Sequence, residues 1–176
     1  PSRAEHTDIY VFAAGEDFPE AVRSFYRLSG PQAILPRFAL GNWWSRYHRY
    51  TEEEYLWVMD DFASRDVPVS VAVIDMDWHI TEPPEGAGSG WTGYTWDPQL
   101  FPNPERFLSS LHARGLHTSL NLHPADGIRY FEEGYKRLAT RMGIDPESGQ
   151  TVLFDPADPE FMLAYFEEIL HPLEDQ

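Results

Sequence analysis

The sequence contains no cysteine, which excludes disulfide bonds and thiolate metal sites. It is also poor in basic residues: 13 Lys and Arg stand against 29 Asp and Glu, which gives a formal net charge of −16. Nucleic acids and anionic membranes are bound through clustered Lys and Arg. We therefore expect neither of them as a partner.

Long apolar segments are lacking as well. No stretch approaches the roughly 18 apolar residues that a membrane-spanning helix needs. The opening residues, PSRAEH, have no signal-peptide character, which favours a cytoplasmic protein. Because the first residue is not Met, we expect an excised or processed piece of a longer chain.

Aromatic residues, in contrast, are abundant. They make up 15% of the chain and include six Trp, while hydrophobic residues reach 42% and charged residues 24%. These proportions are typical of a globular chain. The aromatic side chains either fill a large core or stack on the apolar faces of sugar rings, and composition alone leaves both interpretations open.

The first 35 residues form a segment of their own in the predicted secondary structure. A strand is predicted over 8–13, and a helix begins at Asp17 and ends at Gly30. Pro31 and Pro36 bracket a short linker. We therefore divide the chain into a strand–helix link, residues 1–35, and a second unit, residues 36–176.

In the second unit, strands alternate with helices. Strands are predicted over 38–44, 68–74 and 117–123; a capping box at 51–54 begins the helix after the first of them, and an Asn-Pro pair at 103–104 begins the next. Further helices carry apolar residues at 131–142 and after the Asp-Pro pair at 158–159.

This alternation predicts a parallel α/β fold. The strand at 68–74 is almost continuously apolar, as parallel strands covered on both faces are. No glycine-rich phosphate loop follows any strand, which favours a barrel over a nucleotide-binding sheet. A complete (β/α)8 TIM barrel has eight strands and about 250 residues. We therefore expect a partial barrel, its first three βα units, truncated before the fourth strand.

Polar side chains gather where the second and third predicted strands end. Residues two apart share a face of a strand, which places Asp75 with Asp77 on one strand and Asn121 with His123 on the other. Unpaired carboxylates are costly to bury, so we expect these groups at the mouth of the barrel, where active sites form. The alternative is that both carboxylates cap backbone amides or pair with Arg.

Aromatic side chains accompany these polar groups. The first predicted strand ends in Trp44 and Tyr47, and the long loop after the second strand carries Trp91, Tyr94 and Trp96. For Trp91 and Tyr94 we predict a position that faces a sugar. For Trp96 a small core inside the loop is at least as well supported.

Four motifs resemble, in the same order, the signatures of glycoside hydrolase family 31. They are PRFALGNWWSRY at 36–47, DMDWH at 75–79, YTWDP at 94–98 followed by LFP at 100–102, and LHP at 122–124. The resemblance implies the N-terminal part of the catalytic domain of an α-glucosidase- or α-xylosidase-like enzyme. It also implies that residues 1–35 lead in from an N-terminal β-sandwich.

The resemblance further implies a retaining hydrolysis of α-glycosidic bonds by an Asp nucleophile and an Asp acid/base. It places both beyond Gln176, so we expect no catalytic residue in this chain and an inactive isolated fragment. Asp155 and Asp158 are interpreted as helix caps.

What the resemblance does carry over is part of a sugar subsite. It implies that Asp75 binds hydroxyls of the sugar in the −1 subsite and that Asp77 makes a secondary contact. It also places Tyr47 at an aromatic pocket wall and Asn121 at a pocket-lining position. The predicted substrate-binding set is Asp75, Asp77, Tyr47, Trp44, Asn121, His123 and Trp91.

Two other functions stay open at this point. In the first, Asp75, Asp77, His79 and His123 hold a divalent ion in a metal-dependent TIM-barrel hydrolase; that interpretation gives the aromatic residues no role. In the second, the chain is a non-catalytic sugar-binding module. The favoured interpretation needs no cofactor and no metal, takes an oligosaccharide or α-glycoside as substrate, and leaves a homo-oligomeric parent open.

Overall fold

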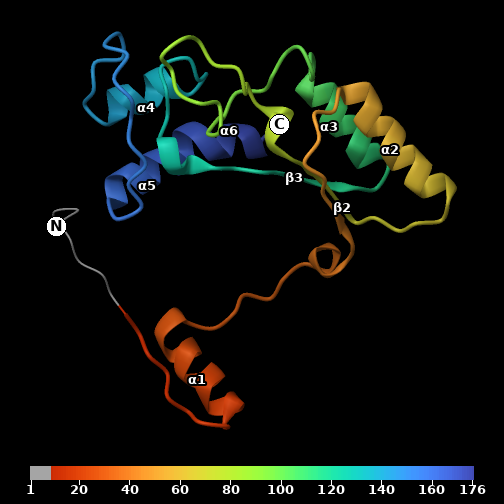
Figure 1. The fold of residues 1–176 in the computed structure, drawn as a ribbon, viewed down its shortest axis with the longest axis vertical. Helices are drawn as coiled ribbons and strands as arrows, with labels where there is room; N and C mark the ends of the chain where they lie inside the picture. Colours follow the sequence, from red (N-terminus) through yellow and green to blue (C-terminus); the bar gives the residue numbers. More distant parts are fainter. Residues whose placement is uncertain (1–8) are drawn as a thin grey trace. The chain divides into compact units, whose positions relative to one another are not determined.

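The computed structural model describes residues 9–176, and the chain separates into two compact units, residues 1–36 and 37–176. The smaller unit contains helix α1 (Phe18–Ser29). Asp17 caps its start by accepting a 3.0 Å hydrogen bond from the backbone N–H of Glu20, and the N–H of Gly30 bonds to Tyr26 O at its end. The helix predicted between Asp17 and Gly30 is thereby confirmed (Figure 1).

The strand predicted over 8–13 is wrong for the part that the structure describes. Residues 9–13 have no strand conformation, and Asp8 lies outside the described residues. A strand needs a neighbour to complete its hydrogen bonds. All strand pairs of the described residues lie in the larger unit, so this segment has no partner.

The larger unit is built on a parallel sheet. Its strands β1 (Trp43–Trp44), β2 (Val71–Ile74) and β3 (His117–Leu120) pair in the order β1-β2-β3 (Figure 1). Helix α2 (Glu52–Ser64) connects the first two strands, and α3 (Pro104–Ala113) connects the second and third. The predicted strand–helix alternation and parallel pairing are confirmed over these elements.

All three strands are shorter than predicted, and β2 begins at Val71 rather than at Pro68. Residues Arg37–Leu40 form the 3-10 helix η1, so only Trp43 and Trp44 pair with β2. Gly41 follows this turn, and a Cβ built there would lie 2.0 Å from Ser70 Oγ, so the two segments approach too closely for a side chain. The third strand ends at Leu120, since η3 (Pro124–Asp126) turns the chain soon after it.

The first hydrophobic core lies between the sheet and helices α2 and α3. Thr51 and Glu54 form the predicted capping box, in which each side chain bonds the backbone N–H of the other residue. The capping box fixes where α2 begins, and the buried face of this helix packs against the sheet. Asn103 caps the start of α3. The buried side chains of this core are Tyr50, Tyr55, Met59, Ala72, Ile74, Trp78, Trp96, Phe101, Phe107, Leu108 and Leu111.

A second core lies among the helices that follow β3. They are α4 (Tyr135–Arg141), α5 (Pro159–Tyr165), the π-helix η4 (Phe166–Leu170) and α6 (His171–Glu174). Asp158 caps α5, as predicted. The buried side chains are Tyr94, Ile128, Tyr135, Leu138, Ala139, Val152, Phe161, Ala164, Tyr165 and Ile169.

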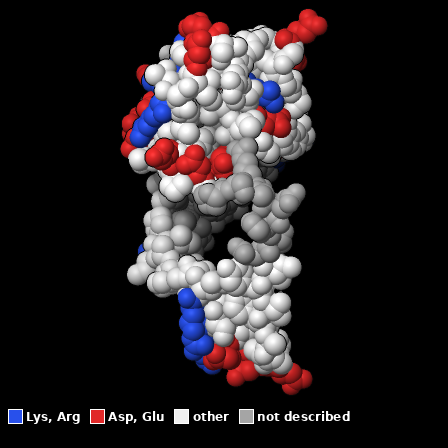
Figure 2. Space-filling view, turned by 90° about the vertical axis from the view of Figure 1, so that its left-hand side faces the viewer, with Lys and Arg blue, Asp and Glu red and all other residues white. Residues whose placement is uncertain are grey.

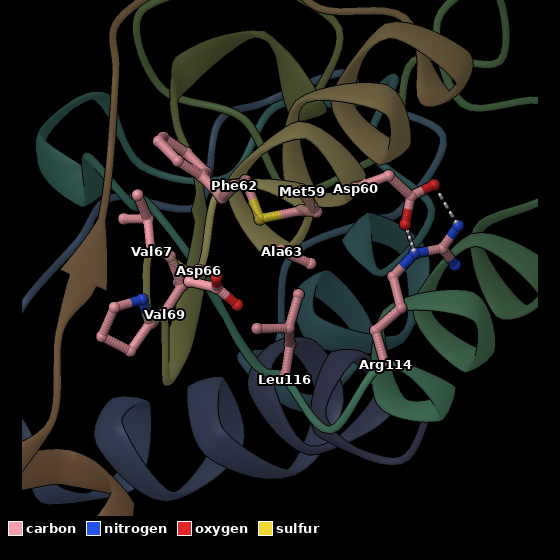
Figure 3. Close-up of a pocket in the computed structure, with 10 residues that line it drawn as sticks. Met59, Asp60, Phe62, Ala63, Asp66, Val67, Val69, Arg114 and Leu116 are labelled. Carbon is pink, nitrogen blue, oxygen red and sulfur yellow. Dashed lines mark hydrogen bonds and ion pairs between the residues drawn. The ribbon is translucent and has the colours of Figure 1, made fainter.

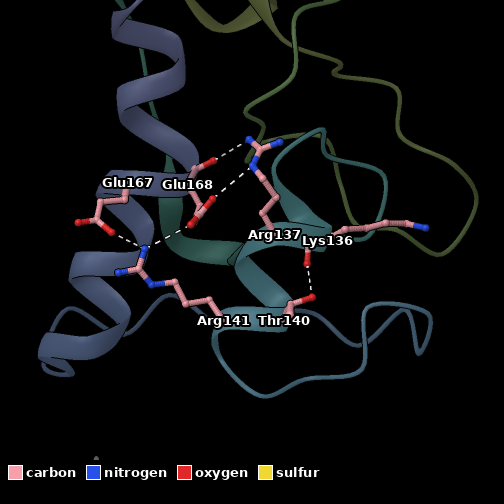
Figure 4. Close-up of polar contacts among 6 residues, drawn as sticks. All are labelled: Lys136, Arg137, Thr140, Arg141, Glu167 and Glu168. Atoms are coloured by element: carbon pink, nitrogen blue, oxygen red, sulfur yellow. Dashed lines mark hydrogen bonds and ion pairs between the residues drawn. The ribbon is translucent and has the colours of Figure 1, made fainter.

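Ion pairs join α4 to the π-helix (Figure 4). Glu168 accepts hydrogen bonds of 3.2 Å from both Arg137 and Arg141, and Arg141 also bonds Glu167. Acidic side chains form groups on the surface in Figure 2, in keeping with the net charge of −16. No helix formed by residues 9–176 is both long and apolar enough to cross a membrane.

Candidate functional site

The ends of β2 and β3 bring Asp75 and Asn121 together. Ile74 and Leu120 are register partners, and each of the two polar residues follows one of them directly. The backbone N–H of Asn121 bonds to Ile74 O at 3.0 Å, and its side-chain Nδ2 donates to Asp75 Oδ1 at 2.5 Å. The parallel register therefore brings into contact two residues that the sequence placed at the same edge of the sheet.

Asp75 also begins a turn. Its Oδ1 accepts a 2.7 Å bond from Met76 N, which starts the 3-10 helix η2 (Met76–Trp78). The alternating strand pattern expected to continue through Asp77 is therefore wrong beyond Asp75. Both carboxylates nevertheless line the same small cavity, together with His48, Tyr50, Ile74, Trp78 and Phe101.

A tilted aromatic pair lies beside the end of β3. The indole of Trp91 rests against the imidazole of His123, with ring centroids 4.5 Å apart, and Trp91 is 50% exposed. The hydroxyl of Thr92 donates to His123 O and accepts from the backbone N–H of Asp126, which ties the loop to the chain after β3. An exposed aromatic face of this kind suits the apolar face of a ring-shaped ligand.

Two members of the predicted set lie apart from these contacts. Trp44 packs against Tyr50, Tyr55 and Phe62 at centroid distances of 5.9, 5.8 and 5.4 Å, so its ring faces helix α2. Tyr47 lies in the segment after β1 and is 71% exposed. The structure thus joins Asp75 with Asn121 and Trp91 with His123, and it joins neither Trp44 nor Tyr47 to these pairs.

The loop after β2 is buried more deeply than predicted. Trp96 is a core residue, but it packs into the first core with the sheet, α2 and α3, not into a small core inside the loop as expected. Tyr94, expected to face a sugar, is only 5% exposed, and that prediction is wrong. Its hydroxyl lies 3.3 Å from the hydroxyl of Tyr165 on α5, and burial raises the pKa of both phenols.

The alternative metal-ligand set is not assembled. His79 is fully buried, its Nδ1 lies 3.2 Å from Ile80 O, and burial lowers its pKa, which favours the neutral ring. His123 packs on Trp91, and Asp75 is bonded to Asn121. Within residues 9–176 no three His, Asp or Glu side chains are grouped so that they could hold a metal ion.

Sequence reasoning missed three residues of this region. His48 and Tyr50 line the cavity with Asp75, and their place just after the first strand was the available signal. Glu132 is buried at 4% exposure and bonds the loop that carries Trp91. No local signal marks it, because a Glu-Glu pair before a helix normally faces solvent.

A second cavity lies at the opposite ends of the strands (Figure 3). Val69 and Leu116, just before β2 and β3, line it with Met59 of α2. Asp60 and Arg114 close one side with two 2.8 Å bonds. Barrel enzymes place their chemistry at the carboxyl ends of the strands, so this cavity is not our candidate site.

The comparison with known families decides the assignment. The family described as "Glycosyl hydrolases family 31 TIM-barrel domain" matches residues 32–173. The chain belongs to glycoside hydrolase family 31. This confirms the resemblance seen in the four sequence motifs.

Curated relatives agree with the match. An α-xylosidase of Saccharolobus solfataricus is 26% identical over 120 residues, which cover 68% of this chain and 15% of that protein. The α-glucosidase 2 of Bacillus thermoamyloliquefaciens is 28% identical over 109 residues, 62% of this chain and 13% of the relative. The chain thus matches only a small part of the length of these enzymes.

Solved structures share the fold. The family 31 α-xylosidase from Xanthomonas citri superposes with a TM-score of 0.62 at 21% identity, over 89% of this chain and 17% of that one. The family 31 α-glucosidase from Bacteroides thetaiotaomicron gives a TM-score of 0.54 at 23% identity, over 85% and 26%. The described sheet and helices therefore belong to a TIM-barrel-type domain.

Proposed function

We propose that these residues are part of a retaining α-glycosidase whose substrate is an α-glycoside or oligosaccharide. Residues 36–176 supply the first three βα units of its (β/α)8 barrel, ahead of the fourth strand, and residues 1–35 link them to an N-terminal β-sandwich. The observation that carries the proposal is the Asp75 carboxylate at the carboxyl end of β2, held by Asn121 from β3.

The geometry of Asp75 suits a sugar contact. Both of its described hydrogen bonds end on Oδ1, from Met76 N and Asn121 Nδ2, so we assign Oδ2 to hydroxyls of the sugar in the −1 subsite. Hydrogen bonds to a charged group are worth about 1.5–3 kcal/mol each. Asp77, in the same cavity, makes the secondary contact.

The remaining predicted residues take outer positions in this proposal. Trp91 with His123 offers the aromatic face for a sugar ring, and Tyr47 projects from the segment after β1. Trp44 acts indirectly, since it packs β1 onto α2.

The catalytic nucleophile and acid/base lie outside residues 1–176 in this proposal. Retention needs two carboxyl groups about 5–5.5 Å apart on either side of the anomeric carbon. Asp155 and Asp158, two aspartates late in the chain, accept hydrogen bonds from backbone amides at 3.2 and 2.9 Å. Residues 1–176 alone therefore bind a sugar at most and cleave none.

Hydrolysis of paired anomers by the full-length protein tests the proposal. The substrates are the 4-nitrophenyl α- and β-anomers of glucose and xylose, with NMR of the first sugar released. We expect cleavage of an α-anomer and an α-configured first product, with no cleavage by residues 1–176 alone. Cleavage of β-anomers only, or an inverted product, contradicts the proposal.

A further inference from the structure

The loop segment 92–97 is buried without being a helix or a strand. All six of its residues are buried, whereas Trp91, directly before it, is 50% exposed. Buried backbone N–H groups need hydrogen-bond partners, and an irregular segment cannot supply them from its own repeat. The partners from elsewhere in the chain therefore decide where this segment lies.

Several of these partners come from the ends of the loop itself. Ile80 N bonds to Thr95 O at 3.0 Å, and Asp97 N bonds to Trp78 O at 2.9 Å. Gly93 lies so close to His79 that a Cβ there would be 2.1 Å from Nδ1. These contacts hold one side of the segment against the end of β2.

Glu132 holds the other side. Its Oε2 accepts a 3.1 Å bond from Tyr94 N and a 2.5 Å bond from Thr95 Oγ1, and Thr95 Oγ1 in turn accepts from Glu133 N at 3.0 Å. Glu132 precedes α4 and is 4% exposed. One carboxylate thus joins the loop after β2 to the segment after β3.

Burying this carboxylate in its charged form costs the folded state free energy. Burial raises the pKa of Glu132 to about 7, the negative charge of Glu133 acts in the same direction, and the bonds from Thr95 and Tyr94 only partly oppose this. A neutral acceptor of similar shape would avoid the cost of burying charge. Stability alone therefore gives no reason for a Glu at this position.

The segment that Glu132 holds carries the aromatic surface of the site. Trp91 lies against His123, and Thr92 bonds both His123 O and Asp126 N. Segment 92–97 follows Trp91 directly in the chain. A shift of this segment would therefore move Trp91 relative to His123.

We propose that Glu132 is a positioning residue of the substrate site: it anchors segment 92–97 so that Trp91 is held against His123 as an aromatic platform for the substrate. The inference rests on the proposed function and deepens it. Glu132 contacts neither reacting atoms nor sugar in this scheme, and it acts through Tyr94 and Thr95.

The test uses the full-length protein and the 4-nitrophenyl α-glycoside that it cleaves fastest. Glu132→Ala should raise KM about 10-fold, with kcat changed less than about 3-fold, because one charge-assisted anchor is lost while the catalytic groups stay in place. Glu132→Gln should have a KM close to that of wild type, since its amide oxygen can accept the same two hydrogen bonds. Glu133→Gln is the matched control: it removes the neighbouring exposed carboxylate and should leave KM unchanged.

Hydrogen exchange gives a readout that does not depend on activity. In Glu132→Ala the amides of 91–97 should exchange about 10-fold faster while those of α2 keep their wild-type rates. If Glu132→Ala does not fold, Thr95→Val, which removes the donor, and Thr95→Ser, which retains it, make the same comparison.

The outcomes separate the two proposals. A wild-type protein that cleaves no α-glycoside contradicts the proposed function, and faster exchange at 91–97 still supports the anchor. An active wild type whose Glu132→Ala or Thr95→Val variant keeps the wild-type KM and exchange overturns the positioning role. Equal loss of protection in α2 and 91–97 also overturns it, because Glu132 would then stabilise the domain as a whole.

Discussion

The side-chain amide of Asn121 donates a 2.5 Å hydrogen bond to the carboxylate of Asp75, and so links the ends of two neighbouring parallel strands. Asp75 is also bonded to Met76 N, so the carboxylate is fixed from two sides. This arrangement orients a charged acceptor before a substrate arrives. It thereby lowers the free-energy cost of ordering the carboxylate when the substrate binds.

Loss of Asn121 should therefore weaken catalysis through Asp75. In the full-length protein, Asn121→Ala should lower kcat/KM for the preferred aryl α-glycoside about 10-fold, the worth of one charge-assisted hydrogen bond. Asn103→Ala is the control. It removes the cap of α3 and should cost about 1 kcal/mol of stability while kcat/KM stays unchanged. Equal kcat/KM in wild type and Asn121→Ala would show that this bond does not serve catalysis.

Thr51→Ala should affect stability but not activity. Thr51 accepts from Glu54 N, and Glu54 accepts from Thr51 N at 2.9 Å, so the change removes one half of the capping box of α2. We expect a loss of about 1 kcal/mol in the free energy of unfolding by urea. Thr51→Ser keeps the hydroxyl and should recover most of it. A loss of activity without a loss of stability would contradict a purely structural role.

The buried carboxylate of Glu132 should make stability depend on pH. Its pKa in the folded protein is about 7, raised from 4.5, whereas in the unfolded chain the ordinary value applies. Below about pH 4.5 the group is protonated in both states. As the pH rises to about 7, the unfolded state loses its proton first, so stability falls by about 3 kcal/mol and stays low above that pH.

Urea unfolding of wild type and Glu132→Gln between pH 5 and pH 8 measures the contribution of Glu132 to the free energy of unfolding. The other titrating groups are the same in both proteins, so their contributions cancel when the two free energies are subtracted. Glu133 carries the neighbouring charge, and burial keeps the phenols of Tyr94 and Tyr165 neutral throughout this range. We expect Glu132→Gln to gain stability relative to wild type as the pH rises. A constant difference would show that Glu132 titrates at its ordinary pKa.

Much of the larger unit follows from local signals in the sequence. The capping box at Thr51 and the Asn103 cap predicted where α2 and α3 begin, and both helices begin there. The polar residues after β2 and β3 could be paired from strand order alone. In these cases the physical cause lies within a few residues of the element.

The remainder depends on distant partners. Tyr94 is buried because Tyr165, 71 residues later, packs on it, and Glu132 is buried because the loop from β2 folds over it. Trp44 faces α2 because its ring packs on Phe62 of that helix. The periodicity of residue types over a short stretch of sequence cannot reveal contacts between such distant residues.

The most direct test of the account is the kinetics of Asp75→Asn in the full-length protein. The matched control is Asp61→Asn, which removes a partly exposed carboxylate of α2 that is paired with Arg65. We predict that Asp75→Asn lowers kcat/KM for the preferred aryl α-glycoside by about 100-fold or more, with unfolding like that of wild type, because the contacts to sugar hydroxyls tighten in the transition state. An Asp75→Asn variant with the same kcat and KM as wild type and Asp61→Asn would contradict the account.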